Sequence, residues 1–239
     1  MNPIDAMPAQ DLTAEGRAFA GRQVLLAGAS DLKQFEQHVL LTAGSAFALA
    51  NYADEQLRTK RRQPQVQSPS LPGVLRLEEN TRLLRASAME VQNALRILRK
   101  LPFARSVTGR EMPRIAGVAH ALLNAAQFRW TLSGFSSFLE GYQAAEPLNL
   151  RELWNLPIAL KLTLLEEILA QASGAFGGLA TSDAALEASL RSLHEISLPL
   201  WSNILEPLVP FERILRDDPA GTYGDMDFDS REMYRLAIE

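Results

Sequence analysis

Apolar residues recur at steps of three and four along most of the chain, which is the spacing of one face of an α-helix. The strongest example is the stretch from Pro147 to Ala172. Asn149 is suited to cap a helix there, and Glu152 follows three residues later, as in a capping box. We therefore predict a helix that begins at Leu150. Its apolar positions cover a broad arc, so we expect it to pack on several neighbours at once.

Two residues inside this helical pattern, Pro157 and Lys161, are unusual for a buried helix. Pro157 removes one backbone hydrogen bond, so it is expected to kink the helix or to split it in two. Lys161 falls near the middle of the apolar arc. Either its aliphatic stem packs while the ammonium reaches water, or the ammonium is buried and paired with a carboxylate from another segment. The spacing leaves both options open.

The same spacing predicts further helices on both sides of this segment. We expect a short helix over 12–27, a long helix over 31–62, and helices over 75–101, 113–128, 133–142 and 182–196, followed by short pieces cut by Pro199, Pro207 and Pro210. Residues 102–112 are expected to form a loop, and residues 217–221 a turn.

A last helix is expected to open at Asp229, because Glu232 completes a capping box there and Phe228 could pack on Met233. Runs of β-branched residues with a period of two are absent from the sequence. We therefore predict an all-α fold, an irregular multi-helix bundle.

Composition suggests where the chain divides. Residues 1–30 are expected to form a flexible lead-in with a short helix, 31–62 a long helix, 63–74 a proline-containing linker, and 75–239 the main helical domain. Because the last predicted helix is still short at Glu239, we expect this domain to be truncated at its C-terminus.

Length and charge exclude several classes of protein. With 239 residues, of which 47% are hydrophobic, the chain is long enough for one large or two small domains with proper cores. A formal net charge of -4 argues against a general nucleic-acid binder, which needs a clustered basic surface. The sequence has no cysteine, which excludes thiolate chemistry and fits a reducing cytosol. It has neither a secretory signal pattern nor a long uncharged apolar run, so no membrane span is expected.

Candidate metal ligands have simpler explanations in this sequence. His38, His120 and His194 are far apart, and none has a second ligand one helical turn away, so we expect no metal site. The alternating aspartates at 225, 227 and 229 resemble a calcium loop or the Asp-x-Asp of glycosyltransferases. Helix capping is the favoured interpretation, because Asp229 is expected to open a helix. No cofactor is expected in this chain.

Aromatic and basic residues offer two further candidates. Trp130, Trp154 and Trp201 could form a sugar-stacking platform, but each stands in an apolar helical pattern, so core packing is favoured. The basic run from Arg58 to Arg62 could contact anionic lipid, although a solvated linker explains it better.

Two blocks of the sequence resemble the cyclic β-1,2-glucan synthase family, which are very large bacterial membrane glycosyltransferases. The first block runs Pro147-Leu148, Glu152-Leu153-Trp154, Pro157-Ile158 and Leu160-Lys161-Leu162, and is similar to that family's "PLT.GELW..PI.LRL" segment. The second runs Glu206-Pro207-Leu208, Glu212-Arg213, Leu215-Arg216-Asp217-Asp218-Pro219-Ala220-Gly221, Tyr223, Met226-Asp227-Phe228 and Arg231, and is similar to "ER.LR.DPAG.Y..MDF.TR..YR". The family's "WLLDN" segment is missing between Arg99 and Met112, so the chain resembles a divergent or fragmentary member.

This resemblance implies a role in glucan synthesis for the parent protein. It implies an N-terminal, cytoplasmic, all-helical region at the inner face of the bacterial inner membrane, which supports or regulates downstream modules that build glucan from UDP-glucose. The chain alone is not expected to be catalytic. The alternative is a free-standing helical protein–protein interaction module, with Pro147 to Ala172 as its docking helix. The candidate structural or interaction residues are Glu152, Trp154, Pro157, Lys161, Arg216 and Asp218.

Overall fold

The computed structural model describes residues 9–28, 31–62, 72–106, 109–176, 183–209, 211–217, 219 and 221–238. These residues form twelve α-helices, one 3₁₀ helix and three short strands, so the prediction of an all-α multi-helix bundle is confirmed. The helices are α1 (Ala9–Arg22), α2 (Leu32–Arg62), α3 (Pro72–Glu79), α4 (Thr81–Leu98), α5 (Arg114–Ala125), α6 (Leu132–Ala145), α7 (Leu150–Phe176), α8 (Asp183–Ser197), α9 (Trp201–Leu205), η1 (Glu206–Leu208), α10 (Glu212–Arg216), α11 (Thr222–Asp225) and α12 (Phe228–Ile238). None of them is long and apolar enough to cross a membrane.

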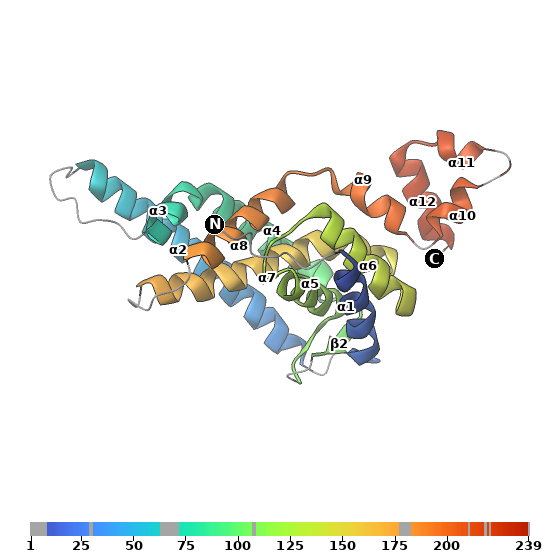
Figure 1. Ribbon diagram of the computed structural model, residues 1–239, viewed down its shortest axis with the longest axis horizontal. Helices are drawn as coiled ribbons and strands as arrows, with labels where there is room; N and C mark the ends of the chain where they lie inside the picture. The colour runs from blue at the N-terminus through green and yellow to red at the C-terminus, as the bar shows by residue number, and fades with distance from the viewer. Residues whose placement is uncertain are drawn as a thin grey trace.

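Helix α7 lies at the centre of the bundle, with α2, α4, α5 and α8 packed around it (Figure 1). It begins at Leu150, as the sequence predicts. The capping box is reciprocal: the backbone N–H of Glu152 donates to Asn149 Oδ1 at 2.9 Å, and that of Asn149 donates to Glu152 Oε2 at 3.0 Å. Of the two outcomes expected at Pro157, a kink or a split, the split does not occur: α7 runs from Leu150 to Phe176 with this buried proline inside it.

Helices α1 and α6 approach each other so closely that their backbones touch at two glycines. A Cβ added to Gly16 would lie 2.1 Å from the carbonyl oxygen of Phe138. One added to Gly141 would lie 1.9 Å from the carbonyl oxygen of Thr13. Both distances are far below any permitted contact, so only glycine allows this packing.

The expected loop at 102–112 contains a β-hairpin, which corrects the sequence prediction. Strands β2 (Phe103–Arg105) and β3 (Glu111–Pro113) pair antiparallel, and β1 (Val24–Leu25) joins the other edge of β2. The helix expected over 12–27 therefore ends at Arg22. These strands are too short to show a period of two, and tertiary contacts position them: Phe103 is buried against Phe35, with ring centroids 5.7 Å apart.

Three further boundaries differ from the prediction. The helix expected over 75–101 is two helices, interrupted at Asn80, whose side chain donates to the carbonyl of Arg76 at 2.8 Å. The expected linker 63–74 is shortened, because α3 already starts at Pro72; residues 63–71 lie outside the described part. Helix α5 ends at Ala125, since the next residues turn into a left-handed conformation, and Pro113 precedes this helix as the last residue of β3.

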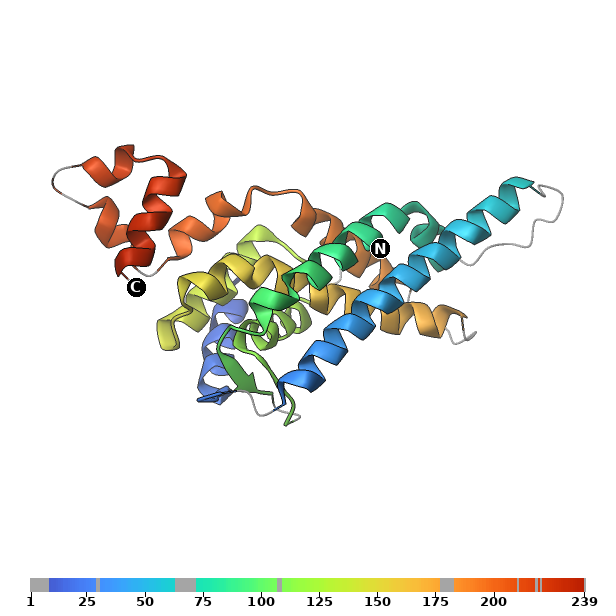
Figure 2. The same cartoon turned by 180° about the vertical axis from the view of Figure 1, so that it is seen from behind.

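The C-terminal helices form a separate group at one end of the molecule. Helices α10 to α12 lie at the end opposite the tip of α2, and α9 and η1 join them to the bundle (Figures 1 and 2). The last helix is capped by Asp227, whose Oδ1 accepts the Ser230 N–H at 2.8 Å, and not by Asp229 as expected. Phe228 packs on Trp154 and not on Met233, which is 74% exposed.

Candidate functional site: a charge network in the C-terminal helices

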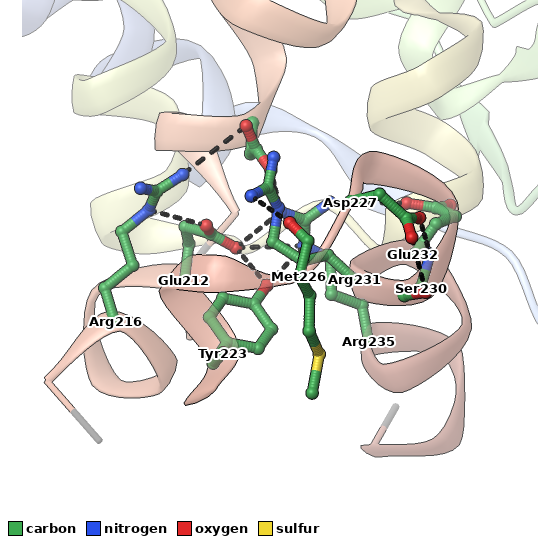
Figure 3. A network of polar contacts seen from close by, with 10 residues as sticks. Glu212, Arg216, Tyr223, Met226, Asp227, Ser230, Arg231, Glu232 and Arg235 are labelled. Atoms are coloured by element: carbon green, nitrogen blue, oxygen red, sulfur yellow. Dashed lines mark hydrogen bonds and ion pairs between the residues drawn. The ribbon is translucent and has the colours of Figure 1, made fainter. Parts of the chain in front are cut away.

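The C-terminal helices are held together mainly by a network of ionised side chains. Three guanidinium groups and three carboxylates meet where η1, α10 and α12 converge, and the Tyr223 hydroxyl lies among them (Figure 3). The second block of the family resemblance contributes most of these residues. The proline-interrupted sequence positions them, because each short helix changes the direction of the chain before the next begins.

Arg235 is the centre of this network and is completely buried. Its Nη2 binds Glu206 and lies 2.8 Å from Glu212 Oε2, and its Nε donates to Glu212 Oε2 at 2.9 Å. The Nε also donates to the Tyr223 hydroxyl at 2.9 Å, while Nη1 lies 3.5 Å from Glu232 Oε2. These contacts pair the charge of the buried guanidinium, which would be strongly destabilising if left unpaired, although Nη1 itself has no hydrogen-bond partner.

Two arginines at the edge of the network complete it. Arg231 donates from Nε to Glu206 Oε1 and from Nη1 to the carbonyl of Met226, both at 2.8 Å. Arg216 donates from Nε to Glu212 Oε1 at 2.8 Å, and its Nη2 lies 3.4 Å from Glu206 Oε2. Arg216, a predicted candidate, therefore belongs to the network, although its side chain is 47% exposed. Asp218, another predicted candidate, lies outside the described residues.

Titration of the network follows from these contacts. Burial alone would raise the pKa of Glu206, but the hydrogen bond and charge of Arg235, with Arg231 and Arg216, lower that pKa below its usual value. Burial and the hydrogen bond to Glu212 raise the pKa of Tyr223 to about 12. The Glu206 carboxylate therefore stays ionised and the Tyr223 phenol stays neutral at pH 7.

The chemistry available to this network is structural. The Tyr223 hydroxyl both donates to Glu212 Oε2, at 2.7 Å, and accepts from Arg235, so its proton is held by Glu212. Each of the three carboxylates faces a guanidinium group. We interpret the network as a polar core of the C-terminal helices, in the place where an apolar core would otherwise hold them together.

The first block of the resemblance contains a second buried ion pair, which joins α5 to α7. Glu152 accepts from Arg114 Nε at 2.7 Å and also binds its Nη2. The same Nη2 donates to the carbonyl of Pro147 at 3.0 Å, and Nη1 donates to Glu146 Oε1 at 3.1 Å. Glu152 thus caps α7 and binds α5 at once. Arg114 was not among the predicted candidates; its signal was an arginine that directly follows Pro113 and opens a mostly apolar helix.

Lys161 is buried and paired, which decides between the two options left by the sequence. Its ammonium binds Glu90 of α4. The lysine side chain is 8% exposed whereas that of Glu90 is 49% exposed, so the pair lies at the edge of the core.

The three tryptophans do not form a common platform. Trp130 and Trp201 pack edge to face, with ring centroids 6.1 Å apart, and both contact Phe135. Trp154 lies elsewhere, against Phe228 of α12. Core packing, the favoured interpretation, describes all three. Trp154 therefore links the central helix to the C-terminal group.

No group of three or more histidine, aspartate and glutamate side chains that could hold a metal ion occurs among the described residues. His38 instead pairs with Glu166 of α7, a contact between residues far apart in sequence. Comparison of the chain with known protein families found no matching family model, and comparison with curated proteins found no match.

Proposed function

We propose that the chain is a non-catalytic helical region of a cyclic β-1,2-glucan synthase-like glycosyltransferase. In this role it supports or regulates glucan synthesis from UDP-glucose by downstream modules of the same polypeptide, at the inner face of the bacterial inner membrane. One observation carries the proposal: several charged residues of the two family-like blocks, Glu152, Glu206 and Glu212 among them, form buried ion pairs.

In the first block these residues are Glu152, which binds Arg114, and Lys161, which binds Glu90 and stands where the family segment has arginine. In the second they include Glu206, Glu212 and Arg231, which surround the buried Arg235. Residues that hold a fold together are expected in a supporting region, whereas a catalytic module would share reactive groups exposed in a cleft.

A transfer assay with the full polypeptide tests the proposal. Bacterial membranes that contain the full-length protein should convert labelled UDP-glucose into labelled β-1,2-glucan. Arg235→Met should lower the yield, because it strands two buried carboxylates, whereas Arg191→Met on the exposed face of α8 should not. A gene without a transferase module downstream of codon 239, or a glucan yield unaffected by deletion of residues 1–239, would refute the role.

The isolated chain is predicted to transfer no glucose. It should release no label from UDP-glucose with magnesium or manganese present, because the ionised groups of its charge network are already paired with one another. Protein-dependent release of label or formation of glucan would contradict this expectation.

A free-standing interaction module is the second candidate, and the surface of α12 favours it. While Arg235 faces inward, the apolar side chains of Met233, Leu236 and Ile238 are 74%, 48% and 50% exposed. Exposed apolar residues on one short helix are typical of contact surfaces. The docking helix expected under this alternative, α7, is instead buried in the core. Met233→Glu with Leu236→Glu should leave the fold intact and abolish any association through this surface.

A further inference from the structure

A pocket lies away from the charge network, where the small sheet meets the helices. It has a volume of about 610 Å³ and is bounded by α1, α2, the β2–β3 hairpin, α5 and α7. In Figure 1 this is the region around β2, α1 and α5. Sites for small molecules in proteins have volumes of roughly 300–1,000 Å³, so this pocket is of the right size.

The inner wall of the pocket is apolar. The side chains of Phe19, Phe35, Met112, Ala121 and Leu162 line it. A ligand that fills this space therefore needs an apolar body, since a sugar or nucleotide would leave its hydroxyl groups without partners.

The polar groups deep in the pocket are already bound to protein. Gln23 accepts from the Tyr142 hydroxyl at 2.6 Å and donates to the carbonyl of Arg114 at 3.2 Å. The Thr163 hydroxyl donates to the carbonyl of Ala159 at 3.1 Å. These bonds leave few polar groups free for a ligand at the inner wall.

The mouth of the pocket is basic. Arg22, Arg105 and Arg110 line it together with His38 and His120. The two carboxylates that also line the pocket have protein partners: Glu166 binds His38, and Glu111 lies 3.4 Å from Arg105. The mouth therefore favours an anion.

Arg110 is the guanidinium best placed to bind that anion. No carboxylate of the described residues lies within 4.0 Å of it, and its Nη2 lies 3.4 Å from His38 Nδ1. Because a guanidinium only donates, His38 Nδ1 accepts, and Nε2 carries the proton given to Glu166. The series Glu166, His38 and Arg110 orients the arginine, while the Arg110 backbone N–H is fixed on Ser106 Oγ at 3.1 Å.

We propose that this pocket binds a small amphiphilic anion, whose apolar body contacts Phe19, Phe35 and Leu162 and whose carboxylate or phosphate head binds Arg110. This inference does not depend on the proposed role in glucan synthesis. Either head group fits the chemistry, since guanidinium groups bind both by charge-assisted hydrogen bonds.

Titration calorimetry of the purified chain tests the proposal with octanoate, octyl phosphate and octylammonium. We expect one molecule of an anion to bind per chain, and the relative affinities of octanoate and octyl phosphate identify the preferred head group. Octylammonium should not bind. Absence of binding by both anions, or binding of octylammonium as tight as that of octanoate, would overturn the proposal.

Two variants locate the site. Arg110→Gln should weaken binding of the preferred anion at least about tenfold, because a charge-assisted hydrogen bond is lost. The exposed Arg191→Gln serves as the matched control and should bind as the parent chain does. Ala121→Phe should fill the pocket and prevent binding. If that variant does not fold, Arg110→Gln alone decides: an unchanged affinity, or an unchanged rise in melting temperature on adding the anion, refutes the proposal.

Discussion

Lys161 and Glu90 show how the surroundings of an ion pair determine the effect of breaking it. The lysine side chain is 8% exposed, but that of the glutamate is 49% exposed. Removing the lysine leaves a carboxylate that water can hydrate. Removing the negative charge leaves a buried ammonium without a counter-charge, which is much less favourable.

Glu90→Gln is therefore predicted to destabilise the fold by roughly 2 kcal/mol, and Lys161→Met by less than about 1 kcal/mol. Urea denaturation midpoints measure both, with Glu140→Gln on the exposed face of α6 as the control. Equal losses of stability in the two variants would contradict this difference in hydration between Glu90 and Lys161.

Arg114 and Glu152 are both buried, so here the two partners should behave alike. Arg114→Met is predicted to destabilise the fold by about 3–5 kcal/mol, because Glu152 is left as a buried charge. Adding Glu152→Gln should recover part of this loss, since the amide oxygen can still cap α7 while the charge is gone. Urea denaturation of the two single variants and of the double variant measures this coupling. A loss of stability in the double variant equal to the sum of the two single losses would contradict it.

At the scale of elements, the contact between α1 and α6 depends on glycine. Gly141→Ala is predicted to destabilise the fold by roughly 3 kcal/mol or more, because the new Cβ would overlap the carbonyl of Thr13. Gly44→Ala in α2 is the matched control: nothing lies within 4 Å of its added Cβ, and alanine favours helix by up to about 1 kcal/mol. Thermal melts should therefore shift in opposite directions. A stabilised Gly141→Ala would refute the close approach.

The helices could be predicted from sequence where local chemistry defines their ends. Asn149 and Glu152 sit three residues apart, and their side chains and backbones bind each other as that spacing implies. Near Asp229 the same spacing misleads, because Asp227 takes the capping position first. The sheet could not be predicted, since its strands have only two or three residues and Phe103–Arg105 pairs on one side with the distant residues Val24–Leu25.

The charge network of the C-terminal helices could be predicted only in part, because it also depends on contacts between separate elements. Glu206, Glu212 and Arg231 appear in the family-like block, but nothing in the spacing indicates that they surround Arg235. Which side chains of the short helices come into contact depends on how the prolines change the direction of the chain. Arg114 was missed because its partner, Glu152, belongs to another helix.

At the scale of the whole molecule, the C-terminal helices and the bundle rest on different forces. The bundle has an extensive apolar core beside its buried Arg114–Glu152 pair, whereas the C-terminal group gathers three carboxylates, Glu206, Glu212 and Glu232, around one buried guanidinium. The lowered pKa of Glu206 means that its stabilising contribution is complete above its usual pKa of 4.5 and is lost as the pH falls through the lowered value. Acid should therefore affect this end first.

We predict that acid releases α12 before it unfolds the bundle. Trp154, which contacts Phe228, reports the release by fluorescence if Trp130 and Trp201 are replaced by phenylalanine. Its signal should change at a higher pH than the far-UV circular dichroism. Glu206→Gln should make this first step shallower, whereas the control Glu140→Gln should not. Simultaneous loss of both signals would contradict the prediction.

The pairing of α1 with α6 also has a consequence for synthesis on the ribosome. The N-terminal helix leaves the ribosome early, but the backbone against which Gly16 packs, at Phe138, is made much later. At roughly 5–20 residues per second, α1 waits several seconds or more for its partner. During that interval its apolar residues, such as Leu12, have no native surface to cover them. Nascent chains that end before α6 should therefore bind holdase chaperones through their first helix and release them once residue 145 has emerged.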